Sequence, residues 1–84
     1  MATYYFHLCD GADVLLDPEG RDLGSDAVVS AALTEARAII SADASAGHIC
    51  LDQRIEVRDA RGKLVHRLPF EEAVRVTHEA VRIR

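Results

Sequence analysis

The apolar residues between positions 29 and 40 recur with the spacing of an α-helix, and this stripe constrains the fold of the 84-residue chain more than any other feature. The stripe consists of Val29, Ala32, Leu33, Ala36 and Ile40. Polar side chains fill the opposite face at the same spacing, which predicts an amphipathic helix. Ser25 or Asp26 is expected to cap its start, and Gly47 is expected to end it. Because two residues of the stripe are alanines, the helix can lie close on a sheet.

Two strand-like segments precede this helix. Tyr4–Cys9 is rich in aromatic residues, and its alternation places Tyr4, Phe6 and Leu8 on one face and Tyr5, His7 and Cys9 on the other. Asp10–Asp13 has the composition of a tight turn, because Asp-Gly supplies the positive φ that a hairpin needs. Val14–Leu16 is expected to return as the second strand, and Asp17–Gly20 to form a second turn.

Two further strands and a second helix are predicted after the first helix. Gln53–Asp59 alternates, with Ile55 and Val57 inward and the charged side chains Arg54, Glu56 and Arg58 outward. A turn at 60–62 leads into the antiparallel partner Lys63–Leu68, and Pro69 ends that strand. A second apolar helical face is formed by Phe70, Ala73, Val74, Thr77, Ala80 and Val81. The β-branched residues in this segment and the alternation of residues 81–84 also fit a strand, so its helical extent stays open.

The order of these elements is ββ-α-ββ-α. Hairpins imply antiparallel pairing, so we expect an α+β fold with one four-stranded antiparallel sheet whose apolar face lies under the first helix. The length corresponds to one domain, residues 1–84. A chain this short forms a thin core, which makes a deep private pocket hard to build.

The charge balance argues against nucleic acid as a partner. The net charge is −4, whereas nucleic-acid-binding modules usually carry a basic stripe. The charge is uneven: residues 1–53 hold nine acidic and two basic side chains, and residues 54–84 hold five acidic and eight basic ones. The two halves are expected to neutralise each other within one molecule, or else to support a polar dimer or the docking of an acidic partner on the second half.

Hydropathy and cysteine usage predict a cytoplasmic protein. No stretch approaches the roughly 18 apolar residues of a membrane span, so we expect no membrane partner. Cys9 and Cys50 are the only cysteines, and no signal peptide precedes them, so reduced thiols are expected.

A short repeat is the one local pattern that suggests chemistry. His7-Leu8-Cys9 and His48-Ile49-Cys50 each place a histidine and a cysteine two residues apart, on one face of an extended chain. Two such pairs could supply four ligands to zinc, although the spacing is not that of a common zinc module. A Cys–His nucleophile pair would also need an orienting group and an oxyanion hole, and the sequence points to neither. The simpler interpretation is an exposed His7 and two ordinary thiols, so we assign no catalytic, cofactor-binding or metal-ligating residue.

The acidic residues near the N-terminus do not have the spacing of a calcium loop, because an apolar strand interrupts them. We interpret them as solvated turns. They are Asp10, Asp13, Asp17, Glu19 and Asp22.

The chain resembles a family of small bacterial proteins described as domain of unknown function 6894. The resemblance is carried by Tyr4–Leu8 with Asp10-Gly11, by Asp17–Gly20 with Leu23, and by the alanine-rich helix that follows. It continues through Ile55–Asp59, Gly62 and Leu68–Phe70, so it covers nearly the whole chain. It implies a cytoplasmic, mostly alphaproteobacterial protein without an assigned activity, and it transfers no site residues. Cys9 stands where the pattern leads us to expect a polar or basic residue.

The function hypothesis that follows is a non-enzymatic interaction or regulatory module. A thin core and a sheet with free edges favour self-association into a dimer or larger assembly, or binding to an unidentified protein. Arg54, Glu56 and Arg58 would steer which surfaces meet. One alternative is a small metal-dependent binder or enzyme that uses the two His-x-Cys pairs. Another is an antitoxin-like partner-binding domain, because the HicB-type domain also places a hairpin with an acidic-Gly turn before an alanine-rich helix.

Overall fold

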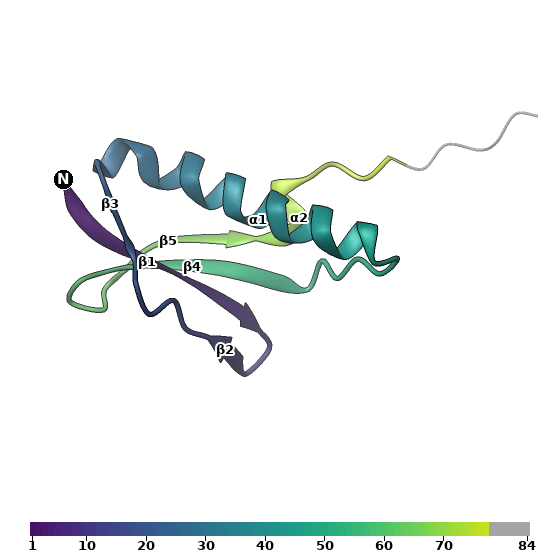
Figure 1. Cartoon of the computed structure of the whole chain (residues 1–84), viewed down its shortest axis with the longest axis horizontal. Helices are drawn as coiled ribbons and strands as arrows, with labels where there is room; N and C mark the ends of the chain where they lie inside the picture. The colour runs from purple at the N-terminus through teal and green to yellow at the C-terminus, as the bar shows by residue number, and fades with distance from the viewer. Residues whose placement is uncertain (78–84) are drawn as a thin grey trace, which may run out of the picture.

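A computed structural model describes residues 1–77 as one sheet with a long helix on one of its faces (Figure 1). The elements are β1 (Ala2–Asp10), β2 (Asp13–Leu15), β3 (Arg21–Leu23), α1 (Val28–Ser45), β4 (Gln53–Asp59), β5 (Leu64–Pro69) and α2 (Phe70–Ala73). A single turn of 3-10 helix, Ser25–Ala27, leads into α1. None of the helices in this part of the chain is long and apolar enough to span a membrane.

The sheet is antiparallel throughout, with the strand order β2-β1-β4-β5. β4 pairs with one edge of β1 over its whole length, from Tyr4↔Asp59 to Asp10↔Gln53. The other edge of β1 is shared by β2 and β3, with β3 pairing Ala2–Tyr4. The predicted α+β class and the antiparallel sheet under the first helix are confirmed. β3 is an additional short strand that the sequence did not reveal, because Arg21-Asp22-Leu23 has little β propensity.

The face of the sheet under α1 forms the core. Tyr4 and Phe6 of β1 and Ile55 and Val57 of β4 point to this side, as their alternation predicts. The α1 residues buried against them are Val28, Ala32, Ala36 and Ile40. The predicted stripe was therefore wrong at Val29, which is half exposed, because α1 is rotated so that Val28 takes the inward position.

The ends of α1 differ in how well they were predicted. Gly47 follows the helix with a φ of +88°, so the predicted stop is confirmed. Neither Ser25 nor Asp26 caps the start, since Ala27 is the N-cap residue and makes no side-chain cap bond. Both residues lie instead in the 3-10 turn, where the Ala27 N–H donates to the Gly24 carbonyl at 3.0 Å and the Val28 N–H donates to the Ser25 carbonyl.

The second helix is much shorter than predicted. α2 ends at Ala73, and Val74 is extended with φ −138° and ψ 154°. The segment 74–77 leads away from the sheet (Figure 1). β-branched side chains at 74, 76 and 77 disfavour helix there, and the predicted positions Ala80 and Val81 lie outside the described residues. The Arg37 Nε–H donates to the Ala73 carbonyl at 2.7 Å, which ties the end of α2 to α1.

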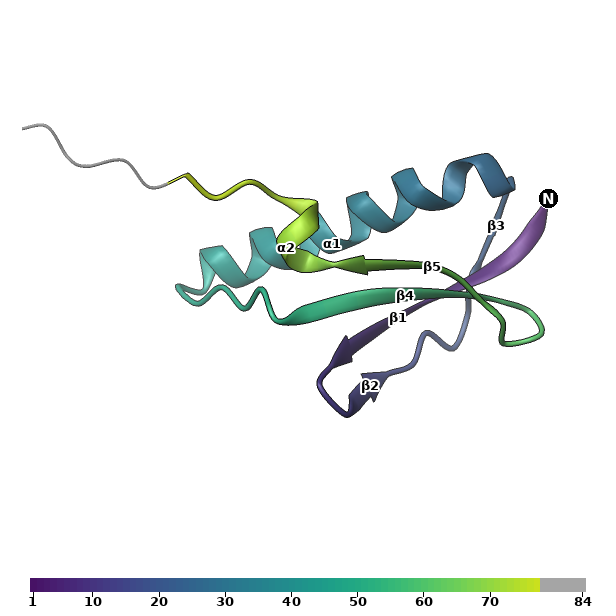
Figure 2. The ribbon, with the colours of Figure 1, turned by 180° about the vertical axis from the view of Figure 1, so that it is seen from behind.

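The opposite face of the sheet, here called the outer face, carries no helix within residues 1–77 (Figure 2). It presents Tyr5, His7 and Cys9 of β1 beside Arg58, Glu56 and Arg54 of β4, as the alternation predicts. Within residues 1–77, the sheet therefore has one apolar face that a helix covers and one polar face without a helix.

Candidate functional site

Strand β2 and the residue after it carry three exposed aliphatic side chains in succession. Val14, Leu15 and Leu16 are 50, 70 and 66% exposed. Within the described part of the chain, β2 pairs only with β1, so its other edge is free. Three consecutive exposed aliphatic side chains on a free strand edge are typical of an interaction surface. We call this segment, Val14–Leu16, the aliphatic edge.

A groove lies between the aliphatic edge and α1. Its volume is about 500 Å³. It exists because α1 does not reach the β2 side of the sheet, which leaves Leu8 and its neighbours only partly covered. Its rim is mostly acidic, with Asp17, Glu19 and Glu35, and Arg21 is paired to Glu35 by an ion pair. The apolar residues that line it are Phe6, Leu8, Leu15, Leu16, Ile39 and Ile55.

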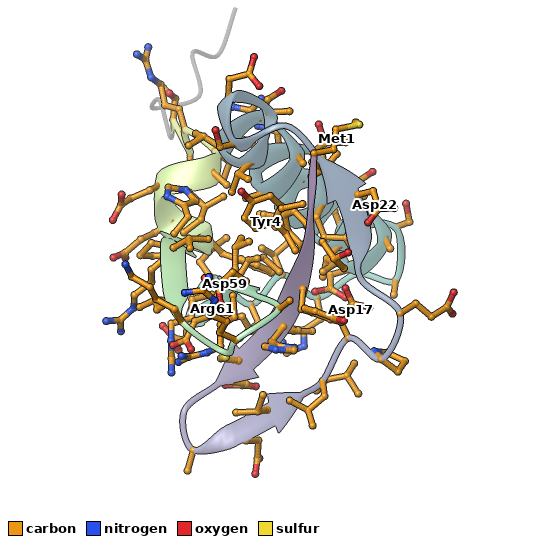
Figure 3. All side chains as sticks on the ribbon, turned by 90° about the vertical axis from the view of Figure 1, so that its left-hand side faces the viewer. Met1, Tyr4, Asp17, Asp22, Asp59 and Arg61 are labelled. Carbon is orange, nitrogen blue, oxygen red and sulfur yellow. The ribbon has the colours of Figure 1, made fainter. Side chains whose placement is uncertain are left out.

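Asp17 holds the aliphatic edge against β1. β2 pairs with residues 8–10 of β1 and β3 pairs with residues 2–4, so on this edge residues 5–7 of β1 have no strand partner. The Asp17 carboxylate accepts the Phe6 N–H at 3.1 Å, and the Asp17 N–H donates to His7 Nδ1 at 3.0 Å. In Figure 3 the Asp17 side chain lies between β1 and the chain that joins β2 to β3. Side chains thus replace the missing ladder bonds.

The same carboxylate also shapes the turn that follows. It accepts the Glu19 and Gly20 N–H groups, both at 3.2 Å. Partial burial raises the pKa of Asp17, but the N–H donors of Phe6, Gly20 and Glu19 and the nearby His7 outweigh it, so the pKa lies below its ordinary value. The interpretation of Asp17 as a solvated turn residue was therefore wrong. An aspartate directly before Pro-Glu-Gly is a signal for such a side-chain turn.

Gly20 fits where no other residue would. Its φ is +72°, and a Cβ atom there would lie 2.9 Å from Thr3 Cγ2 and 3.0 Å from the Tyr4 carbonyl oxygen. The turn therefore packs directly on β1 before the chain enters β3. Arg21, the next residue, stacks its guanidinium over the Phe6 ring at 4.9 Å from the centroid.

The outer face is organised around Glu56. Its carboxylate accepts Arg54 Nε–H at 2.9 Å and Arg58 Nη2–H at 3.1 Å. The hydrogen bond from Arg54 holds the pKa of Glu56 below its ordinary value; partial burial opposes this effect, and the bond from Arg58 and the charges of both arginines add to it. Tyr5 stacks on His7 beside this row, with ring centroids 6.4 Å apart. These contacts fix the charged side chains of the outer face in place.

The two His-x-Cys pairs do not form one site. His7 contacts Asp17, Cys9 is fully buried beside Arg54, and His48 and Cys50 lie in the loop between α1 and β4. In residues 1–77, no three His, Cys, Asp or Glu side chains are grouped so that they could hold a metal ion. Burial raises the pKa of the Cys9 thiol, and Glu56 adds to this effect. The sequence-based expectation that His7 is exposed was wrong, because its side chain is half buried.

The groove was not predicted from the sequence. The sequence did contain a hint of it, because a short edge strand rarely has three consecutive aliphatic residues, as Val14–Leu16 does. Whether these three residues are covered depends on how far α1 extends across the sheet, and a local sequence pattern does not predict that extent. Chemically, an apolar floor with an acidic rim suits a partner that carries aliphatic and basic side chains.

The comparisons with known proteins agree with the motifs of the first strand and its turns. No curated protein and no solved structure shows significant similarity to the chain. The family model described as "Domain of unknown function (DUF6894)" matches residues 3–71, which cover β1 from its second residue on, the Asp17 turn, α1, β4 and β5. The chain therefore belongs to the DUF6894 family.

Proposed function

We propose that this protein is a non-enzymatic, cytoplasmic interaction module that self-associates through the aliphatic edge and the groove beside it. The observation that carries the proposal is the exposure of Leu15 and Leu16 next to the partly covered Leu8 and Ile39. A monomer would keep this apolar surface in water, and burial contributes roughly 25 cal/mol per Å² before the costs of association.

The small core supports the same proposal. In the core that residues 1–77 form, the large side chains that are fully buried are Phe70, Ile55 and Val57. A chain of this size gains proportionally more from an interface than a larger domain does. A metal-dependent activity and a HicB-type antitoxin role have no comparable supporting contact among the described residues, so we do not propose them.

The test is the solution mass of the protein over the micromolar to millimolar range, measured by light scattering. The wild type is expected to exceed the 9.2 kDa of one chain. Leu15→Ser combined with Leu16→Ser should return it to the mass of one chain, because the apolar contact is lost. The matched control is Val29→Ser combined with Ile49→Ser, which removes two exposed aliphatic side chains away from the groove and should leave the assembly unchanged. A wild-type mass of 9.2 kDa at every concentration would contradict the proposal.

A further inference from the structure

We propose that residues 81–84 of a second copy of this chain fill the groove beside the aliphatic edge. The inference rests on the proposed function and names the segment of the partner that the groove receives. Residues 78–84 lie outside the part of the chain that the structure describes, and at 81–84 their sequence is Val-Arg-Ile-Arg. Aliphatic and basic residues thus alternate in this segment. That is the chemistry to which an apolar floor with an acidic rim is complementary.

The groove lies where the helical layer over the sheet is missing. Leu15, Leu8 and Ile55 form one row across β2, β1 and β4, on the face under α1. Ile55 is 1% exposed beneath the helix, whereas Leu15 is 70% exposed. Ile39 of α1 lines the groove from the helix side. The volume of about 500 Å³ lies within the roughly 300–1,000 Å³ of sites that bury small molecules, so two aliphatic side chains fit there and would complete the layer.

The alternation of the segment suits a groove that is open on one side. In an extended chain, Val81 and Ile83 point to one side and Arg82 and Arg84 to the other. With Val81 and Ile83 on the apolar floor, both arginines are on the open side of the groove. Arginine stems follow apolar surface while their guanidinium groups stay in water, so these groups can reach the carboxylates of the rim.

The charges around the groove favour this occupant. Residues 10–22, which contain the aliphatic edge and its two turns, hold five acidic side chains and one basic one. On the rim, Glu19 is exposed and forms no ion pair within residues 1–77, and the side chain of Glu35 is 35% exposed although it pairs with Arg21. A segment with two arginines and no acid is attracted to such a rim, whereas an acidic segment would be repelled.

The course of the chain favours a second copy over the same molecule. α2 follows β5, which lies at the opposite end of the sheet from β2, and the Arg37 side chain ties Ala73 to α1. α1 therefore separates the end of α2 from the groove. Residues 74–77 lead away from α1 and the sheet in both views (Figures 1 and 2). The linking residues 74–80 span at most about 25 Å when extended, which allows residues 81–84 to reach a neighbouring molecule.

The first test mixes two variants that should each fail to associate. Val81→Ser/Ile83→Ser lacks the aliphatic side chains of the segment, and Leu15→Ser/Leu16→Ser lacks those of the groove. Each should weaken self-association by about tenfold or more and stay near the mass of one chain in light scattering at micromolar concentration. In an equimolar mixture, one variant supplies an intact groove and the other an intact segment, so the mass should rise to that of two chains. Val76→Ser, which removes a 70% exposed aliphatic side chain just before the segment, is the control and should behave as wild type.

The second test reverses the charge of the segment. Arg82→Glu/Arg84→Glu should weaken self-association by about tenfold or more at low salt, because the acidic rim then repels the segment. The difference from wild type should shrink as salt is added, since salt screens exposed charges. Arg61→Glu/Lys63→Glu changes the net charge by the same amount at two exposed bases of the β4–β5 turn and should have a much smaller effect.

The outcomes separate this inference from the proposed function. If Val81→Ser/Ile83→Ser keeps the wild-type mass profile while Leu15→Ser/Leu16→Ser does not, the proposed function stands and residues 81–84 are not the occupant of the groove. A mixture that stays at the mass of one chain also overturns the inference, as do equal effects of the two charge reversals. A wild type that is monomeric at every concentration contradicts both proposals.

Discussion

The two edges of β1 are built in different ways. On one edge, β4 forms a regular ladder of seven residue pairs, from Tyr4↔Asp59 to Asp10↔Gln53. On the other edge, two strands of three residues leave a gap that Asp17 and His7 bridge with hydrogen bonds. Leu8 lies between the two, with Ile55 on the regular side and Leu15 on the bridged side.

Because of this difference, apolar residues on the two edges of β1 are exposed to very different extents. Ile55 is fully buried under α1, whereas Leu15 is mostly in water although both face Leu8. α1 covers the side of the sheet where β1 and β4 form a regular ladder, whereas the side with β2 extends past α1. Apolar residues on the bridged side are therefore free for a partner.

The largest expected effect is a difference in stability between substitutions at Ile55 and Leu15, the two residues that pair with Leu8. Ile55→Ala should lower the free energy of unfolding by about 2–5 kcal/mol, through lost transfer energy and a cavity. Leu15→Ala should change it by less than about 0.5 kcal/mol, because the side chain is exposed in the single chain. Urea titrations followed by circular dichroism at low protein concentration measure both. Similar losses would mean that the two edges contribute alike to stability.

Asp17→Ala probes the bridge itself. It should cost about 1.5–3 kcal/mol, because three backbone N–H groups lose a charged acceptor. Asp52→Ala, an exposed acid in the loop before β4, is the matched control and should be nearly neutral. Equal stability of the two variants would show that the bridged edge does not depend on this carboxylate.

The same contact predicts a pH dependence. The pKa of Asp17 is lowered in the folded state, so its contribution is fully present above the ordinary aspartate pKa of about 3.9 and is lost as the pH falls through the folded value. Asp17→Asn should therefore flatten the loss of stability on acidification between neutral pH and the acid range. Parallel curves for wild type and variant would contradict the assignment.

The smallest expected effect concerns the thiols and should leave stability unchanged. Cys50 is partly accessible in the loop before β4, whereas Cys9 is buried on the outer face and its thiol has a raised pKa. Iodoacetamide should modify Cys50 in the native protein and Cys9 only after denaturation, as read by mass spectrometry of the peptides. Rapid labelling of Cys9 would show that the β1–β2 end of the outer face opens readily.

The regular edge was largely predictable from the sequence, and the bridged edge was not. Alternation in residues 53–59 and 64–69 placed Ile55 and Val57 inward and the arginines outward, because period two is a local property of a strand. β3 was missed because three residues carry too little pattern. The bridge by Asp17 was missed because it depends on a tertiary contact with β1, even though the Asp-Pro-Glu-Gly turn was recognised.

The errors in the two predicted helices also arose because tertiary contacts and local propensity compete with the apolar spacing. The stripe in α1 fixed the helix but misplaced Val29, because an alternative face through Val28 is equally apolar and the sheet decides between them. In the second helix, the apolar spacing from Phe70 onward suggested a long helix, yet β-branched residues after Ala73 favoured extended chain. The groove depends on where both helices stop, so no single segment could indicate it.

The close contact at Gly20 determines where this small chain can accept foreign sequence. Every other amino acid there would combine an unfavourable φ with a collision against β1. A peptide graft or affinity tag between Asp17 and Arg21 would therefore push β3 off the sheet. Gly47 also has a positive φ, but nothing lies within 4 Å of a Cβ atom built there, and it sits in the loop after α1, away from both sheet edges. That loop is the place for a graft, a fluorophore or a circular permutation site.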